Sequence, residues 1–346
     1  MSTRATRAIR ATRATRANPA TRTTRANPAT PAASVSFVAP VAPLERGSSA
    51  AGPRPGAAGQ RRATPRRYLL CPPTYFEVVY AINPWMDPTV PVDRQRAVDQ
   101  WERLAATYVA LGHEVITVAA APDLPDMVFA ANGGVVVDGV GIGARFATEE
   151  RRPEAELYRD HLRDAGVEVV HEPQFVNEGE GDLLVAGDVI LAGTGFRTDP
   201  RAHAEVAALT GREVVPLRLV DPRYYHLDTA ACVLDDRTVA YLPAAFDAAS
   251  RTELERRFPD AILASAADAA VLGLNAVSDG RHVVVAREAE QLASQFEARG
   301  YVPVPVDVSE LRKAGGGPKC CTLELRPSFA DLDAALEGPR LEEVPA

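Results

Sequence analysis

Thiol, imidazole and carboxylate side chains recur along the sequence, and together they could carry out nucleophilic chemistry. In chain order they are Asp126 and Asn132, then Glu178, Glu180 and Asp182, then His226 and Asp228, then Asn275 and Ser278, and finally Cys320. A cysteine becomes a nucleophile when its pKa is lowered or a cation lies nearby, and a histidine oriented by a carboxylate can then protonate a leaving amine and activate water. Cys320 and His226 are the candidate pair. The glycines of the segment 315–319 predict a flexible approach of the backbone to a substrate, and a cationic substrate would itself lower the pKa of the thiol.

Each of these residues also has an ordinary structural interpretation. A buried cysteine usually packs as a small hydrophobic residue, and on a strand Cys320 and Cys321 would point to opposite faces, so that only one could face a site. His226 could be a hydrogen-bonded core imidazole, and the acidic residues around Glu178 could be solvated loop carboxylates beside glycine turns. Residue types alone leave both interpretations open.

The elements that would position these residues repeat from Tyr68 onward. Four units have the same order of a β-hairpin, a helix and a further strand, and the polar residues fall on the first strand of each unit. The five expected helices cover residues 92–111, 152–165, 200–210, 247–257 and 288–299. A fifth unit is split, because its first strand, residues 321–325, lies at the end of the body, and the strand from Tyr68 lies at the start. Closing these ends into one ring removes exposed sheet edges, so the pattern predicts a radial α/β propeller whose first strands line the axis.

Length and composition set the domain organisation. The chain has 346 residues, 46% of them hydrophobic, which is enough for a large core. Residues 1–66 repeat Thr-Arg-Ala and Asn-Pro-Ala-Thr units and predict a disordered tail. We expect a single catalytic domain over residues 67–330 and a short C-terminal tail over 331–346. The arginine-rich N-terminal tail is typical of a transit peptide or a weak nucleic-acid-binding arm, and the alternative is an extension without function.

Charge and cysteine usage exclude several classes of protein. Residues 1–67 contain 13 arginines and one acidic residue, whereas the whole chain has a net charge of −8, so the body is acidic. An acidic body repels nucleic acid and anionic lipid and attracts a cationic small substrate. The sequence has neither an apolar run of 18 residues nor a secretory signal, which predicts a cytoplasmic protein with no membrane partner. The four cysteines and six histidines lack metal-binding spacing, so we expect no metal and no cofactor.

Four motifs of the body, in this order, resemble those of the dimethylarginine dimethylaminohydrolase and arginine deiminase relatives, the guanidino-group-modifying or pentein superfamily. They are Pro125-Asp126-Met127-Val128-Phe129, Glu178-Gly179-Glu180-Gly181-Asp182, His226-Leu227-Asp228-Thr229 and Lys319-Cys320-Cys321-Thr322-Leu323. The resemblance covers the body from Tyr68 to about Pro327. It implies a five-bladed α/β propeller of ββαβ units around a central active-site channel, closed by pairing of the N- and C-terminal segments. It also implies a nucleophilic cysteine that forms a covalent adduct with a guanidinium carbon.

The same resemblance implies roles for individual residues. Cys320 is the nucleophile, with Cys321 buried, His226 is the general acid and base, and Glu178 completes the catalytic set. The implied substrate-binding residues are Asp126, Asn132, Arg145, Arg197, Asp228, Asn83, Glu180 and Asp182. Arg145 and Arg197 would hold the substrate's α-carboxylate, which suits the fork of a guanidinium group. Either Glu178 or Glu180 could be the acid that faces the site.

The substrate is indicated by Asn132, which stands where dimethylarginine hydrolases carry an acidic residue. Asn132 and Asn83 resemble the substrate-pocket asparagines of the arginine dihydrolase branch, which implies cleavage of arginine to ornithine, carbon dioxide and ammonia. The alternatives are a dimethylargininase that gives citrulline and dimethylamine, an amidinotransferase, or a noncatalytic arginine-binding module. The expected partner is a small molecule and not nucleic acid, and a homo-oligomer is compatible with the sequence.

Overall fold

The computed structural model describes residues 36–37 and 61–327. The predicted C-terminal tail, residues 331–346, lies outside the described residues, and so does the predicted N-terminal tail apart from 36–37 and 61–66. Within the described part of the chain, no helix is long and apolar enough to cross a membrane.

The described body begins ahead of the boundary predicted at residue 67. The Nη1 atom of Arg61 lies 2.5 Å from Oδ2 of Asp235, and its guanidinium group stacks 3.6 Å from the ring centre of Tyr301. Thr64 donates a backbone hydrogen bond of 2.8 Å to the carbonyl of Asp279. Residues 61–64 are therefore attached to the body by specific contacts.

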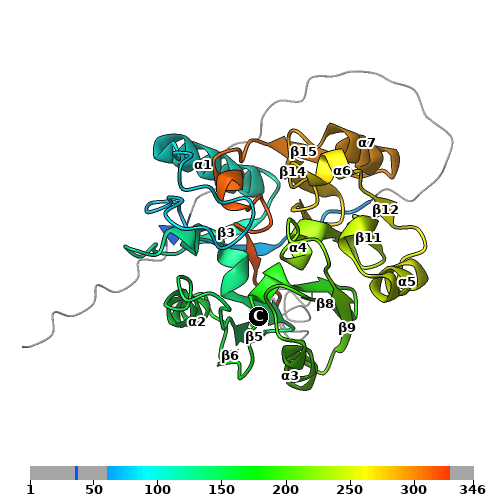
Figure 1. Cartoon of the computed structure of the whole chain (residues 1–346), viewed down its shortest axis with the longest axis horizontal. Coiled ribbons are helices and arrows are strands. Elements are labelled where there is room, and N and C mark those ends of the chain that lie inside the picture. The colour runs from blue at the N-terminus through cyan, green and yellow to red at the C-terminus, as the bar shows by residue number, and fades with distance from the viewer. Residues whose placement is uncertain (1–35, 38–60, 328–346) are drawn as a thin grey trace, which may run out of the picture. The chain divides into compact units, whose positions relative to one another are not determined.

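The body has a mixed α/β fold, as predicted, and its strands form small sheets (Figure 1). The four three-stranded sheets are β4 (Gly134–Val137), β5 (Val140–Gly143) and β6 (Val169–His171); β7 (Leu183–Ala186), β8 (Val189–Thr194) and β9 (Glu213–Arg218); β10 (Ala231–Asp235), β11 (Thr238–Tyr241) and β12 (Ile262–Leu263); and β13 (Val277–Ser278), β14 (His282–Ala286) and β15 (Val302–Val306). In each sheet the first two strands pair antiparallel and the third pairs parallel to the second. Each sheet is therefore one ββαβ unit.

A helix connects the second and third strands of each unit, and Figure 1 shows these helices outside the strands. The connecting helices are α2 (Glu154–Asp164), α3 (Pro200–Thr210), α5 (Ala248–Arg257) and α7 (Glu290–Ala298), and shorter helices are α4 (Leu227–Ala230) and α6 (Ala266–Ala269). All four connecting helices fall inside the predicted ranges. The hairpins follow from local turn chemistry: Val137 pairs with Val140 across the Asp138-Gly139 turn, in which both φ angles are positive, as Asp-Gly turns favour.

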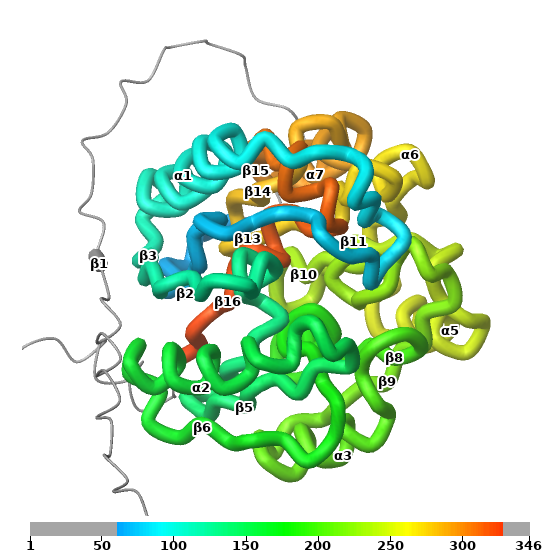
Figure 2. Tube along the Cα trace, turned by 60° about the vertical axis from the view of Figure 1, so that its left-hand side comes forward, coloured from blue at the N-terminus to red at the C-terminus, as the bar shows by residue number. Residues whose placement is uncertain are grey.

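Segments from both ends of the body make the remaining sheet. Its order is β1 (Ser36–Phe37), β3 (Glu114–Thr117), β2 (Arg67–Leu70) and β16 (Leu323–Glu324). Strand β2 pairs antiparallel with β16, with Leu69 opposite Leu323, and parallel with β3, which follows helix α1 (Arg94–Ala110). Figure 2 shows β2 and β16 side by side although they are far apart in the sequence. Helix α1 begins at the N-cap Asp93, whose carboxylate accepts from the backbone N of Arg96, and packs Trp101 and Leu104 into the core.

One prediction about the positions of the polar residues is wrong. Only Ser278 lies on a first strand, β13. The others lie in short turns and helices immediately before the first strands: η1 (Pro125–Val128), η2 (Ala130–Gly133), η3 (Gly179–Gly181), α4, the bend at Asn275, and the turn that follows η5 (Leu311–Ala314). Glycines and side-chain-to-backbone hydrogen bonds favour turns over ladders at these points. The backbone N of Cys321 donates to the carbonyl of Gly317, and that of Thr322 to Lys319, so Cys320 and Cys321 do not alternate on a strand, and both are buried.

Candidate active site

The thiol of Cys320 is buried and lies between two polar side chains. Its Sγ donates to Oδ2 of Asp228 at 3.2 Å and accepts from Nδ2 of Asn275 at 3.1 Å. The amide oxygen of Asn275 also accepts from the backbone N of Cys320 and of Gly317, each at 3.0 Å. Asn275 therefore fixes both the thiol and the loop that carries it.

The glycine loop before Cys320 is tightly packed, which differs from the flexible approach predicted from the sequence. A Cβ atom on Gly316 would lie 2.1 Å from Cε1 of Phe129. A Cβ atom on Gly315, whose φ is +84°, would lie 2.9 Å from Oδ1 of Asn83. The glycines at these positions thus allow the backbone to pass directly beneath Phe129 and Asn83, and this close passage sets the position of Cys320.

Burial raises the pKa of the Cys320 thiol well above its ordinary value, and the negative charge of Asp228 raises it further. Burial also raises the pKa of Asp228, to about 6, against the opposing attraction of His226 and the hydrogen bond from Cys320. The pair therefore holds a neutral thiol beside a carboxylate near neutral pH. A cation placed between them would stabilise the thiolate.

His226 lies just before α4 and is held by Glu178. Its Nε2 is 2.7 Å from Oε2 of Glu178, and both side chains are buried. Burial raises the pKa of Glu178, but Arg197 and His226 outweigh it, so the pKa is well below its ordinary value and the group is ionised. An ionised carboxylate only accepts hydrogen bonds, so Nε2 of His226 carries the proton and Nδ1 is the nitrogen free for proton transfer.

Arg197 connects this pair to the segment around residue 82. Its Nη1 lies 3.2 Å from Oε2 of Glu178, its Nη2 donates to the carbonyl of Ile82 at 2.7 Å, and its guanidinium group lies 4.9 Å from the ring centre of Tyr225. The other oxygen of Glu178 accepts from the backbone N of Ala147 at 3.0 Å. Glu178 is thus fixed from three sides, as an orienting carboxylate must be.

Asn132 and Asp126 lie on the other side of the site and meet a second arginine, Arg151. Oδ1 of Asn132 accepts from Nη1 of Arg151 at 2.6 Å, and the carbonyl of Asp126 accepts from Nη2 at 3.2 Å. Oδ2 of Asp126 accepts from the hydroxyl of Tyr80 at 2.9 Å, and burial raises the pKa of this carboxyl group. Arg151 is itself buried and forms a bidentate pair with Glu154.

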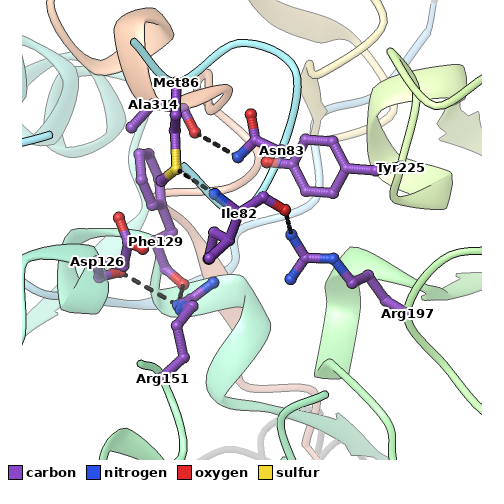
Figure 3. A pocket seen from close by; sticks show the side chains of 9 residues that line it. All are labelled: Ile82, Asn83, Met86, Asp126, Phe129, Arg151, Arg197, Tyr225 and Ala314. Atoms are coloured by element: carbon purple, nitrogen blue, oxygen red, sulfur yellow. Dashed lines mark hydrogen bonds between the residues drawn. The ribbon is translucent and has the colours of Figure 1, made fainter. Parts of the chain in front are cut away.

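A small cavity lies next to these groups (Figure 3). Its lining residues are Ile82, Asn83, Met86, Asp126, Phe129, Arg151, Arg197, Tyr225 and Ala314. Figure 3 shows Arg151 and Arg197 reaching toward the cavity from one side, while Asn83 donates to the carbonyl of Ala314 at 3.0 Å on the other. Cys320 and His226 do not line this cavity, but Arg197 contacts Glu178 and so adjoins the pair of Glu178 and His226.

Five of the predicted substrate-binding residues do not line the cavity: Asn132 and Asp228, whose contacts are given above, and Glu180, Asp182 and Arg145. Glu180 binds Lys319 at 2.6 Å and also pairs with Arg326, so Glu178 and not Glu180 contacts His226. Both oxygens of Asp182 are occupied, by the backbone N of Leu227 at 3.0 Å and the hydroxyl of Thr198 at 2.7 Å, and Asp182 therefore positions the His226 segment.

Arg145 is the last of the five predicted residues that do not line the cavity. It is exposed, its Nη1 lies 3.5 Å from the carbonyl of Pro173, and its backbone bridges to Asn177. Arg151 occupies the place beside the cavity instead. Reasoning from the sequence missed Arg151, and the signal available was its Arg-x-x-Glu spacing to Glu154, which favours an ion pair across one helical turn.

Four buried polar atoms of the site have no hydrogen-bond partner among the described residues: Oδ1 of Asp126, Nδ2 of Asn132, Nδ1 of His226 and Oδ1 of Asp228. Each such atom costs about 1–3 kcal/mol when it is left unpaired. Two of the four are carboxylate oxygens, which suit a ligand that carries several N–H donors and a positive charge. The part of the chain that the structure describes contains no group of three or more His, Cys, Asp or Glu side chains that could hold a metal ion.

Known proteins resemble this chain over most of its body. The family model described as N,N dimethylarginine dimethylhydrolase, eukaryotic, matches residues 82–327. N(G),N(G)-dimethylarginine dimethylaminohydrolase of Mycobacterium tuberculosis is 52% identical over 280 residues, which cover 81% of this chain and 92% of that protein. The bifunctional arginine dihydrolase/ornithine cyclodeaminase ArgZ of Synechocystis sp. is 35% identical over 284 residues, or 78% of this chain and 39% of that protein. The crystal structure of the N-terminal domain of an ArgZ variant bound covalently to a reaction intermediate has a TM-score of 0.73 at 35% identity and covers 76% of this chain and 99% of that domain.

Proposed function

Because the chain belongs to the dimethylarginine dimethylaminohydrolase family of the guanidino-modifying superfamily, we propose that it attacks the guanidinium carbon of arginine with the Cys320 thiolate. The matching members are hydrolases, and the chain is a hydrolase of guanidino carbon–nitrogen bonds. The observation that carries the proposal is the set of unpaired buried atoms on Asp126, Asn132, His226 and Asp228, of which Asp228 contacts the thiol directly.

The substrate cation activates its own nucleophile in this proposal. Oδ1 of Asp126 and Oδ1 of Asp228 are unpaired acceptors for the N–H groups of a guanidinium ion. The bound cation neutralises the carboxylate beside Cys320 and adds a positive charge next to the sulfur, which lowers the pKa of the thiol. The α-carboxylate of the substrate binds to Arg151 and Arg197, the two arginines that line the cavity. Arg151 thus replaces Arg145, which was expected from the sequence.

The reaction then needs one proton donor and one acceptor, and Nδ1 of His226 serves as both. As the thiolate forms, the thiol proton passes to Nδ1 of His226. The thiolate then forms a C–S bond to the guanidinium carbon, and the imidazolium gives the proton to the departing amine, whose C–N bond breaks and which leaves as ammonia. Water next attacks the same carbon and loses a proton to His226, and the C–S bond breaks to regenerate the thiolate. The product of this round is citrulline, and Glu178 keeps the imidazole oriented throughout.

Asn132 favours a second round of hydrolysis, which would complete the cleavage to ornithine, carbon dioxide and ammonia. Because Oδ1 accepts from Arg151, the amide presents Nδ2, a hydrogen-bond donor, as its unpaired atom. A donor can bind the carbonyl oxygen of a ureido group, whereas a carboxylate at this position would repel it. Retention of the ureido product for a second attack is the step that distinguishes an arginine dihydrolase from a deiminase.

Dimethylargininase activity is the second candidate. The observation in its favour is the 52% identity to the Mycobacterium tuberculosis protein of that name. Met86, Phe129 and Ile82 also give the cavity an apolar side that suits N-methyl groups. Asn132 argues against it, because a dimethylargininase stops at citrulline and needs no donor to retain the ureido group for a second attack.

We further infer that the ββαβ units are the five blades of a propeller whose axis passes through the site. Four units and the sheet that joins β2 to β16 share one pairing pattern, and residues that precede three of the first strands, Ala131, Asp228 and Asn275, hydrogen-bond to Cys320. This arrangement supports the closure predicted from the two ends of the sequence.

Product analysis tests the proposed function. The purified chain is incubated separately with L-arginine and with asymmetric dimethylarginine, and ornithine, citrulline, ammonia and dimethylamine are quantified, with Cys320→Ser as the control. Ornithine from arginine supports the dihydrolase, and citrulline with dimethylamine from dimethylarginine moves the second candidate to first place. Turnover of neither substrate refutes both.

A further inference from the structure

The buried carboxylate of Glu154, the first residue of α2, takes no part in the reaction proposed above. Its side chain is fully buried, and both oxygens are bound by Arg151, Oε1 by Nε at 3.0 Å and Oε2 by Nη2 at 2.8 Å. Burial raises the pKa of Glu154 to about 7 against the opposing charge of Arg151. An apolar residue at this position would leave the buried guanidinium group of Arg151 without its carboxylate partner.

The other edge of the Arg151 guanidinium group faces the site. Its Nη1 donates to Oδ1 of Asn132 at 2.6 Å, and the group lies 4.6 Å from the ring centre of Phe146. A guanidinium group is planar, so a bidentate contact on one edge fixes the direction of the other edge. Glu154 and Asn132 are therefore coupled through one rigid group.

We propose that Glu154 is a positioning residue that holds Arg151 in the plane from which it orients the Asn132 amide and faces the substrate. The inference rests on the proposed function. In that function Asn132 presents Nδ2 to the reacting group, and we assign control of this orientation to Glu154 and Arg151. Without the bidentate contact, the guanidinium group keeps single contacts with Asn132, with the carbonyls of Asp126 and Phe129 and with the Phe146 ring. The Asp126 and Glu178 carboxylates, which also attract Arg151, can then rotate its plane. The Asn132 amide could then turn and present its oxygen.

Glutamine at position 154 is the informative substitution. It has nearly the same volume, but it offers one acceptor and an NH₂ group that faces an Arg151 N–H, so the bidentate pair is lost. Aspartate keeps the charge and both acceptors with a shorter reach and is the conservative variant. Glu310→Gln is the matched control, because Glu310 is also buried and paired with a cation, Lys313 at 2.6 Å, without contacting the cavity.

The first measurement is the affinity for L-arginine in the Cys320→Ser background by calorimetry, which does not depend on turnover. Glu154→Gln is expected to weaken binding about 10-fold, Glu154→Asp by less, and Glu310→Gln not measurably. In the active enzyme, Glu154→Gln raises KM more than it lowers kcat, and the ratio of ornithine to citrulline falls.

Unchanged affinity, KM and product ratio in a folded Glu154→Gln protein overturn the inference. If Glu154→Gln does not fold, Arg151→Lys replaces it: the lysine keeps the charge but cannot bridge Glu154 and Asn132 in one plane, and an unchanged product ratio is again the refuting result. Failure of the unsubstituted chain to turn over arginine or dimethylarginine refutes the proposed function separately, and the binding measurement then still decides the role of Glu154.

Discussion

Replacing Asp228 by asparagine is expected to make the Cys320 thiol more reactive while it makes the enzyme less active. The carboxylate has two opposing effects on the thiol in the structure. Oδ2 lies 3.2 Å from Sγ and opposes thiolate formation, whereas Oδ1 is unpaired and anchors the substrate cation in the proposed reaction. Asparagine removes the charge and keeps the shape.

The size of the effect follows from the 3.2 Å separation. Two unit charges at that distance interact by about 5 kcal/mol at an effective dielectric constant of 20. About 1.4 kcal/mol is enough for a tenfold change in an equilibrium constant, so even a third of this repulsion raises the thiolate population at a fixed pH by about 10-fold. Loss of the anchoring charge should lower kcat/KM for arginine by at least about 100-fold.

Alkylation by iodoacetamide at pH 8 is the assay, because the reagent is small and uncharged and reacts with the thiolate. The modified peptide is identified by mass spectrometry, and the rate at Cys320 is compared between Asp228→Asn and the unsubstituted protein. Cys71, Cys232 and Cys321 are also buried and serve as internal references for general loosening of the fold. L-Arginine should accelerate the alkylation of the unsubstituted protein unless it shields the sulfur.

Equal or slower alkylation of Cys320 in Asp228→Asn, with the three reference thiols unchanged, would falsify the electrostatic argument. Faster alkylation at all four cysteines would show instead that the substitution opened the fold. Retained activity in Asp228→Asn would remove the carboxylate from the substrate-binding role.

Three further predictions concern the loop, the pH dependence and the choice of arginine. Gly316→Ala should destabilise the protein by about 1–3 kcal/mol, because the new methyl group meets the Phe129 ring, and an unchanged thermal midpoint would contradict this. The pKa of Asp228 is raised to about 6, and this carboxyl group attracts a cation only when it is ionised. The affinity of a thiol-free variant for arginine should therefore rise about tenfold per pH unit below pH 6 and then level off. A flat calorimetric profile from about pH 5 to about pH 8 would refute this. Arg151→Ala should raise KM at least about 10-fold and Arg145→Ala less than about 2-fold, and equal effects in steady-state kinetics would restore Arg145 to the site.

The helices and hairpins were predictable because their signals are local. The pair Asp138-Gly139 specifies its hairpin without reference to the rest of the chain, and the ranges of the helices follow from amphipathic spacing and caps such as Asp93. The mixed α/β fold follows from the repetition of those local units. The pairing of β2 with β16 could be predicted from the sequence only because four complete units left one unpaired strand at each end of the body.

The direction of individual side chains was not predictable, because it depends on turns. Glu178 and Glu180 flank Gly179, which has φ of +54° and lies against the backbone of Gly134. That left-handed residue sends the two carboxylates to different surroundings, so neither strand alternation nor motif spacing could choose between them. Arg145 and Arg151 posed the same problem: both precede α2, and burial of the Glu154 partner decides which one turns inward.

The pairing of β2 with β16 also sets the order in which a working enzyme comes into being during synthesis. The orienting carboxylate Glu178 and the imidazole of His226 leave the ribosome well before Cys320, and the strand that follows the thiol must find a partner made some 250 residues earlier. A nascent chain therefore holds the proposed acid-base groups without the proposed nucleophile. Hydrolytic activity should appear only when the sheet that joins both ends of the body has closed, so that completion of the fold and acquisition of reactivity are the same event.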